Sequence, residues 1–195
     1  MFYVPIIPMQ LINGGKGIGT GFSTDILNYN PLTIIDYITD RLKETNHTET
    51  LNLMPYYSGF KGKIIPLTES KYLIKGVYQV LSDKQVRITE LPIGTWTDDY
   101  KKYIEELIDI KPSTNEADDK KKGKGQKKSK VINQVKDYID MSTDTSVDFT
   151  ITFAPGVISK LQSEMNGGEG DVECNALEKL LKLYTTRSTT NMHVF

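Results

Sequence analysis

Five of the fifteen glycines in this 195-residue chain lie between Gly14 and Gly21, in the segment LINGGKGIGTGFST. Glycine has no Cβ, so a backbone this rich in it can take positive φ angles and approach another surface closely. One aliphatic residue, Ile18, stands in the middle of these glycines. The segment is therefore predicted to be a tight glycine loop that carries an isoleucine at its tip.

The glycine loop departs from both common phosphate-binding patterns. A P-loop reads Gly-x-x-x-x-Gly-Lys-Ser/Thr, but Gln10 stands where the first glycine is needed and Gly17 follows Lys16. The dinucleotide pattern Gly-x-Gly-x-x-Gly is broken by Phe22, which stands where its third glycine is needed. A phosphate-binding enzyme remains a weaker alternative.

Two interpretations of Ile18 remain open on the residues alone. Proteins that bend DNA from the minor groove push an apolar side chain between base pairs and unstack one step. Ile18 would serve as such a wedge, with Asn13, Lys16 and Thr20 holding phosphates. The alternative is an ordinary core isoleucine in a tight turn.

Composition narrows the function classes further. The formal net charge is −1, so any contact with nucleic acid has to come from a local patch. Cys174 is the single cysteine, which excludes an internal disulfide and favours a reducing compartment. His47 and His193 are the only histidines, and neither is spaced from Cys174 as a zinc site requires. No apolar run reaches the ~18 residues of a membrane span.

Hydrophobic spacing predicts four helices. Asn30 is the expected N-cap of the first, with Pro31 at its first position, and Thr97 is the expected N-cap of the second. A third begins at Pro155, and the fourth is short. The apolar positions of the last three are Tyr100, Tyr103, Ile104, Leu107 and Ile108, then Ile158, Leu161 and Met165, then Leu177, Leu180 and Leu181.

Strand patterns complete an α+β fold, a small antiparallel sheet packed with several helices. Residues 1–12 are expected to be extended, and GKIIPL, YLIKGVYQVL and KQVRITEL are expected to form one antiparallel meander. SVDFTITF alternates like a half-buried strand, and LYTTRSTTNMHVF is expected to be extended. The lysine-rich residues 112–130 are expected to be a disordered insertion.

Several motifs, in order, resemble the eukaryotic-type (type IIA) DNA topoisomerase II family. They are YVPIIPMQLINGGKGIGTGFST with YNP after it, GFKGKI, ITELPIGTWTDDYKKYI and TTNMHVF. The likeness spans nearly the whole chain, except residues 112–130 and the NGGEGD region. It implies the tower (shoulder) domain of the DNA-cleavage core. Residues 1–30 would be the lead-in from a winged-helix domain with the DNA-wedge loop, and residues 31–195 the tower body.

The resemblance also assigns roles to residues. It implies that Ile18 intercalates in the minor groove and bends the duplex, and that Trp96 contacts DNA. Without the resemblance, Trp96 is interpreted as a half-buried anchor at the start of a helix. Phe22 replaces the tryptophan that is usual in the family. The family's nucleophilic tyrosine and acidic metal ligands lie upstream, so no catalytic residue, metal site or cofactor is expected in this chain.

For the full-length protein, the resemblance implies an ATP-hydrolysing, Mg²⁺-dependent homodimer that passes one DNA duplex through another. The expected partners are double-stranded DNA and the winged-helix, metal-binding and ATPase domains of the same polypeptide, with no membrane. The expected location is intracellular, in the nucleus if cellular and otherwise at a site of viral DNA replication. The alternative is an independent DNA-binding or scaffold module without topoisomerase activity.

Overall fold

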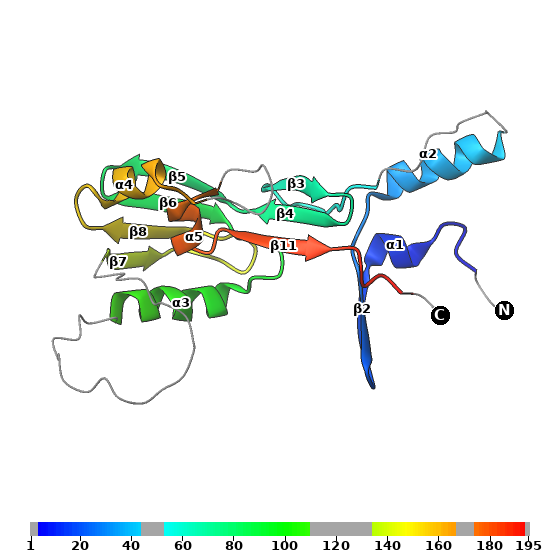
Figure 1. Cartoon of the computed structure of the whole chain (residues 1–195), viewed down its shortest axis with the longest axis horizontal. Coiled ribbons are helices and arrows are strands. Elements are labelled where there is room, and N and C mark those ends of the chain that lie inside the picture. Colours follow the sequence, from blue (N-terminus) through cyan, green and yellow to red (C-terminus); the bar gives the residue numbers. More distant parts are fainter. Residues whose placement is uncertain (1–3, 44–52, 110–133, 167–173, 194–195) are drawn as a thin grey trace. The chain divides into compact units, whose positions relative to one another are not determined.

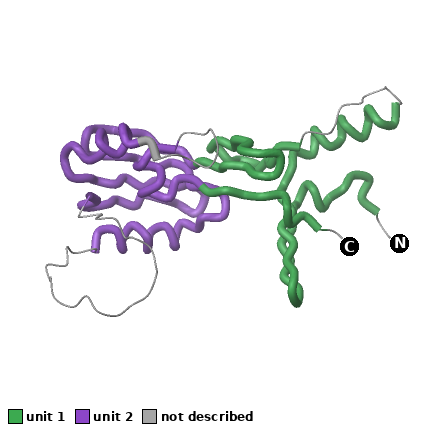
Figure 2. The backbone as a smooth tube through the Cα atoms, viewed as in Figure 1, with its two compact units in different colours: residues 1–75, 169–172, 185–195 green, residues 76–168, 173–184 purple. Residues whose placement is uncertain are grey.

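The computed structural model describes residues 4–43, 53–109, 134–166 and 174–193. The chain divides into two compact units, which Figure 2 distinguishes by colour. Unit 1 comprises residues 1–75, 169–172 and 185–195, and unit 2 comprises residues 76–168 and 173–184. Both units combine helices with small antiparallel sheets, so the predicted α+β class is confirmed. The insertion at 112–130, His47 and most of NGGEGD lie outside the described residues.

Unit 1 is built around a hairpin, two helices and a small sheet (Figure 1). The sheet has the strand order β11-β4-β3, and β3 and β4 are antiparallel. The elements are α1 (Met9–Asn13), β1 (Gly15–Gly19), β2 (Phe22–Ile26), α2 (Pro31–Leu42), β3 (Lys63–Thr68), β4 (Lys71–Lys75) and β11 (Tyr184–Ser188).

A small core fixes the start of α2. The Asn30 side-chain oxygen accepts a hydrogen bond of 2.9 Å from the backbone N–H of Leu32, so the predicted N-cap is confirmed. Ile34 is buried on the inner face of α2, whereas Leu42 at its end is 79% exposed. The buried cluster of this unit is Leu27, Tyr29, Ile34 and Tyr72.

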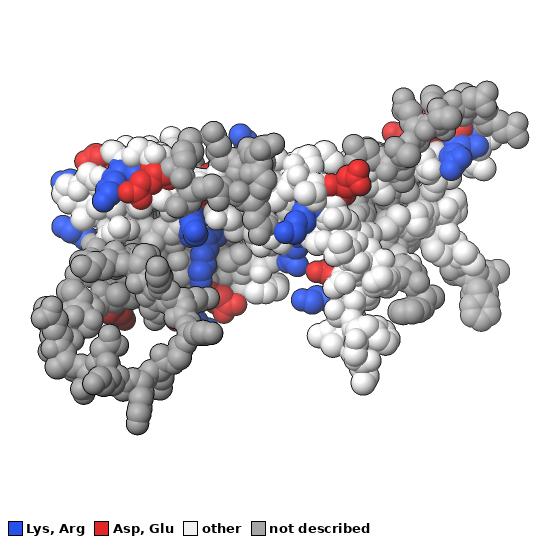
Figure 3. All heavy atoms as spheres, viewed as in Figure 1, with Lys and Arg blue, Asp and Glu red and all other residues white. Residues whose placement is uncertain are grey.

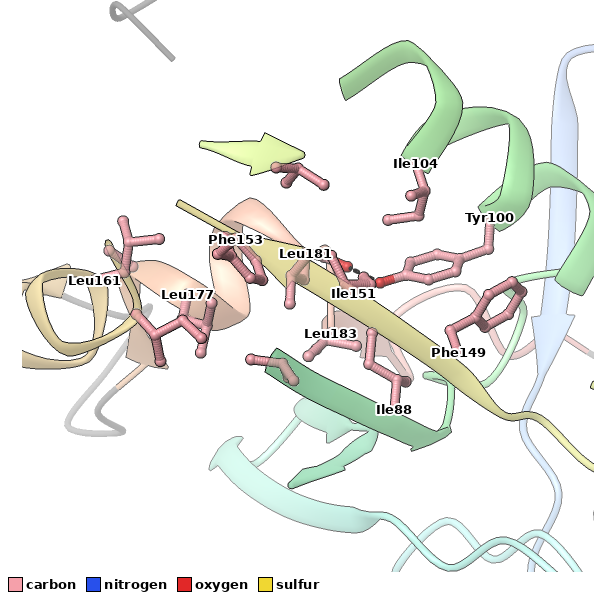
Figure 4. Packing of buried hydrophobic residues seen from close by; sticks show 14 of the residues in the cluster. Ile88, Tyr100, Ile104, Phe149, Ile151, Phe153, Leu161, Leu177, Leu181 and Leu183 are labelled. Atoms are coloured by element: carbon pink, nitrogen blue, oxygen red, sulfur yellow. Dashed lines mark hydrogen bonds between the residues drawn. The ribbon is translucent and has the colours of Figure 1, made fainter. Parts of the chain in front are cut away.

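Unit 2 contains a four-stranded antiparallel sheet of order β5-β6-β8-β7. Phe149, Ile151 and Phe153 are fully buried on one face of β8, as the alternating pattern predicted. Figure 4 shows these side chains packed with residues of α3 and α5. The elements are β5 (Val77–Ser82), β6 (Gln85–Glu90), α3 (Thr97–Asp109), β7 (Val135–Asp140), β8 (Phe149–Phe153), α4 (Val157–Ser163), β9 (Met165–Asn166), β10 (Cys174–Asn175) and α5 (Ala176–Leu180).

The structure corrects two strand predictions. The expected single meander is divided at Gly76, because β4 belongs to the sheet of unit 1 and β5 to the sheet of unit 2. The Gly76 N–H bonds the Leu183 carbonyl at 2.9 Å, and a Cβ at this position would collide with the Glu90 carbonyl oxygen. Strand β7 was not foreseen; it pairs with β8 at the edge of the sheet.

Helix boundaries differ from the predictions at three places. The segment 1–12 was expected to be extended, but α1 begins within it at Met9. Thr97 is the first helical residue of α3 rather than its N-cap, since the N–H of Tyr100 bonds the carbonyl of Trp96 at 2.9 Å. Met165 lies in β9 rather than in the preceding helix, which ends at Ser163.

Candidate nucleic-acid interface

The glycine segment forms a β-hairpin rather than an irregular loop. Strands β1 and β2 pair from Gly15↔Ile26 to Gly19↔Phe22, which leaves Thr20 and Gly21 as the turn. Gly21 has a φ of +85°, a conformation that residues with a Cβ rarely adopt. Figure 2 shows the hairpin as a thin arm extending from the rest of unit 1.

The two faces of the hairpin differ because side chains alternate along a strand. Gly15, Gly17 and Gly19 occupy one face of β1, while Lys16 and Ile18 occupy the other. A Cβ at position 19 would lie 2.9 Å from Cε2 of the Phe22 ring, so this aromatic side chain lies over Gly19. On this face, Phe22 lies over Gly19 and the Thr24 methyl group would lie 3.3 Å from a Cβ at Gly17.

Ile18 is 86% exposed, so the alternative that it is a core residue is wrong. It pairs with Ser23 across the hairpin, on the opposite face from Phe22, which is also exposed. Residues 17–24 contain no charged side chain, and the end of the hairpin is white, that is uncharged, in Figure 3. The Ile18 side chain therefore lies outside the core and is accessible to a binding partner.

The base of the hairpin is tied to α1. The Asn28 side-chain amide donates to the carbonyls of Ile12 at 3.2 Å and Asn13 at 2.8 Å. These are carbonyls of the last helical turn, which have no partner within a helix. Asn13, predicted to contact phosphate, thus also helps to set where the hairpin begins.

Charged groups flank the base of the arm. Lys16 pairs in register with Asp25, and the Asp25 carboxylate accepts a hydrogen bond of 3.3 Å from Nη1 of Arg187. Burial raises the pKa of the nearby Tyr57 hydroxyl, and the positive charge of Arg187 partly opposes that rise. Lys16 is exposed on the same face as Ile18, which suits a cation that contacts phosphate.

Trp96 belongs to unit 2, whereas the other predicted contact residues belong to unit 1. Its side chain is 76% exposed, so the half-buried anchor expected from the sequence is wrong. Tyr100, one turn later, fills the buried position at the start of α3 and is 2% exposed. Gly94, with a φ of +90°, turns the chain just before Trp96.

No second candidate for a functional site stands out among the described residues. Among these residues, no group of three or more His, Cys, Asp or Glu side chains is placed to hold a metal ion. Cys174 is buried, and His193 is exposed. No helix in the described ranges has both the length and the apolar character that crossing a membrane requires.

Sequence reasoning missed Thr24. Its hydroxyl lies 2.8 Å from the carbonyl oxygen of His193, 169 residues further along the chain. Arg187, the partner of Asp25, was missed for the same reason. No local pattern indicates such distant partners; only the return of the chain's end to unit 1 reveals them.

Comparison with known proteins places the whole chain in one family. The family model for the A-subunit of DNA gyrase/topoisomerase IV matches residues 1–195. DNA topoisomerase 2 of Drosophila melanogaster is 36% identical over 195 residues, covering 100% of this chain and 12% of the fly protein. DNA topoisomerase 2 of Acanthamoeba polyphaga mimivirus is 30% identical over 234 residues, covering 100% of this chain and 17% of the viral protein.

A solved structure agrees with these sequence matches. The Plasmodium falciparum topoisomerase II DNA-binding, cleavage and re-ligation domain is 36% identical, with a TM-score of 0.73, over 98% of this chain and 22% of that chain. The present chain therefore spans only a minor part of the length of the proteins that it matches. It belongs to the DNA gyrase/topoisomerase IV A-subunit family, as its resemblance to topoisomerase II indicated.

Proposed function

We propose that this chain is the DNA-bending tower domain of a type II DNA topoisomerase, and that Ile18 is its wedge. The observation that carries the proposal is the 86% exposure of an isoleucine at the end of a glycine-rich arm. Residues 1–30 would supply the lead-in and the arm, and residues 31–195 the body of the domain.

Bending a DNA duplex costs free energy, and a wedge lowers that cost. Smooth bending of a site by 40–90° costs on the order of 1–6 kcal/mol. An aliphatic side chain placed between two base pairs lowers that cost by kinking one step and replacing part of the lost stacking. Residues 17–24 carry no carboxylate, so the end of the arm can enter the groove without repelling the phosphates.

The remaining predicted contacts would hold the backbone on either side of the kink. Lys16 would pair with a phosphate from the face that carries Ile18, and Asn13 and Thr20 would donate hydrogen bonds. The exposed indole of Trp96 would contact DNA from unit 2. These contacts position the duplex without reading its sequence.

The full-length protein is then an ATP-hydrolysing homodimer that acts on double-stranded DNA inside a cell, in the nucleus or at a site of viral replication. Mg²⁺ would support strand cleavage in another domain. The residues of this chain would leave that step to the other domain. Their task is to bend the gate duplex so that its scissile phosphates reach the residues that cut them.

Plasmid relaxation by the full-length enzyme tests this function. Ile18→Ala should reduce relaxation and DNA cleavage while DNA-independent ATP turnover stays near wild type. Leu42→Ala is a matched control, since Leu42 is an aliphatic residue of unit 1 with 79% exposure. An independent binding or scaffold module would instead show no relaxation even in the wild-type protein.

A further inference from the structure

We propose that residues 187–193 act as a strap that fixes the direction of the hairpin, with Thr24 as its central anchor. Thr24 is then a positioning residue for the wedge. This inference rests on the proposed function of Ile18, but it makes its own claim about the DNA-free protein. It concerns unit 1 alone, which contains both the hairpin and the strap.

The Thr24 hydroxyl accepts one hydrogen bond from the backbone of the strap and donates another to it. Oγ1 accepts a hydrogen bond of 3.1 Å from the backbone N–H of His193. The same oxygen lies 2.8 Å from the His193 carbonyl oxygen and 3.2 Å from that of Asn191, and its single proton is donated to one of them. The next residue continues the attachment, because the Asp25 N–H bonds the Asn191 carbonyl at 2.9 Å.

Side-chain contacts reinforce the strap at both of its ends. Arg187 donates to the Asp25 carboxylate at 3.3 Å. The Tyr29 hydroxyl donates to the sulfur of Met192 at 3.3 Å. Asp25 lies in β2 and Tyr29 lies three residues beyond the end of that strand, so both contacts act where the hairpin joins the rest of the unit.

The strap is itself fixed to the sheet of unit 1. The Thr189 N–H bonds the Ser70 carbonyl at 2.9 Å, just before β4 begins. Residues 184–188 form β11, which lies next to β4. The backbone of the strap is therefore hydrogen-bonded to Ser70 at one point and to Thr24 at another.

Such a path matters because a two-stranded hairpin is marginally stable by itself in water. Thr24 pairs with Gly17, the residue directly before Ile18. A tilt of β2 at Thr24 would therefore also move the Ile18 side chain. A misplacement of about 1 Å is enough to weaken a preorganised site strongly. The strap would hold Ile18 in the direction needed before DNA arrives.

The test uses three variants of the full-length enzyme. Thr24→Val keeps the shape of the side chain but removes its hydroxyl, and Thr24→Ser restores the hydroxyl. Thr33→Val is the matched control, because Thr33 is an exposed threonine of α2 in the same unit. The first readout is amide hydrogen exchange of residues 22–26 without DNA, and the second is DNA bending measured by energy transfer.

Thr24→Val should speed exchange of the Asp25 amide about three- to tenfold, as expected for the loss of hydrogen bonds that hold its partner segment. It should also reduce bending, while Thr24→Ser and Thr33→Val behave like wild type. Unchanged exchange in Thr24→Val would overturn the strap. Faster exchange with wild-type bending would overturn the positioning role, provided that Ile18→Ala impairs bending. If Ile18→Ala itself leaves bending unchanged, the proposed function fails, and the exchange data still decide whether the strap exists.

Discussion

The hydroxyl of Tyr100 in α3 donates a 2.8 Å hydrogen bond to the carbonyl oxygen of Leu181, directly after α5 (Figure 4). Tyr103 does the same for the carbonyl of Leu180 at 2.6 Å. The last carbonyls of a helix have no partner within it. Two tyrosines of α3 thus supply hydrogen bonds to the carbonyls at the end of α5. These bonds join α3 to α5 within unit 2.

Tyr100→Phe should therefore destabilise the protein without changing its fold. The substitution removes a donor from a buried site and leaves the Leu181 carbonyl without that hydrogen bond, at a cost of about 1–3 kcal/mol. Urea unfolding measures the loss. Tyr37→Phe, on a partly exposed residue of α2, is the control and should stay near wild type. Equal stability of Tyr100→Phe and the control would show that the buried hydrogen bond contributes nothing.

An ion pair on the sheet of unit 2 predicts how stability depends on pH. Arg87 binds both carboxylate oxygens of Asp148, at 2.8 and 2.6 Å. The hydrogen bond from Arg87 is the main cause that lowers the pKa of Asp148 below its ordinary value. A carboxyl group with a lowered folded-state pKa stabilises the protein above its unfolded pKa of about 3.9, and this contribution is lost as the pH falls through the folded value.

The wild-type protein should accordingly lose this contribution between about pH 5 and pH 2, whereas Asp148→Asn should lack it throughout. The difference should be small, because the Arg87 side chain is 45% exposed and solvent screens the pair. Thermal unfolding of both proteins across this range, with Asp36→Asn as an exposed control, measures the difference. A constant difference down to pH 2 would contradict the assignment.

Two adjacent glycines at the base of the hairpin should respond differently to alanine. Gly14 has a φ of +63°, and a Cβ there would lie 2.7 Å from the backbone oxygen of Ile26. Gly15 has open space around it. Gly14→Ala should cost about 1–2 kcal/mol or more, whereas Gly15→Ala should stay within about 0.5 kcal/mol of wild type. Thermal unfolding compares them, and similar losses in both would mean that the backbone at Gly14 can relax.

Local periodicity was enough to predict the elements whose side chains alternate or recur regularly. The inward face of α3 and the buried side of β8 followed from spacing alone, because Ile104 and Phe149 repeat with neighbours of the same kind. The division of the expected meander could not be predicted from spacing. It occurs at Gly76, whose N–H donates a hydrogen bond to the Leu183 carbonyl between β4 and β5. That partner is more than a hundred residues away in the chain.

The candidate site was predicted in part for the same reason. The glycine spacing identified the segment around Ile18, but the residues alone could not decide between core and surface. That choice depends on whether anything packs against the hairpin, which only the tertiary structure reveals. Trp96 was expected to be a half-buried anchor because it directly precedes a helix, yet Tyr100 takes the buried place at the start of α3.

The most direct test of the account measures the bend in DNA bound to the full-length enzyme. Energy transfer between dyes at the two ends of a duplex should report a clear loss of bending for Ile18→Ala relative to wild type and to Leu42→Ala. Stability should stay within about 0.5 kcal/mol of wild type, because the side chain is 86% exposed. Wild-type bending in a stably folded Ile18→Ala enzyme would contradict the central claim that this isoleucine is the wedge.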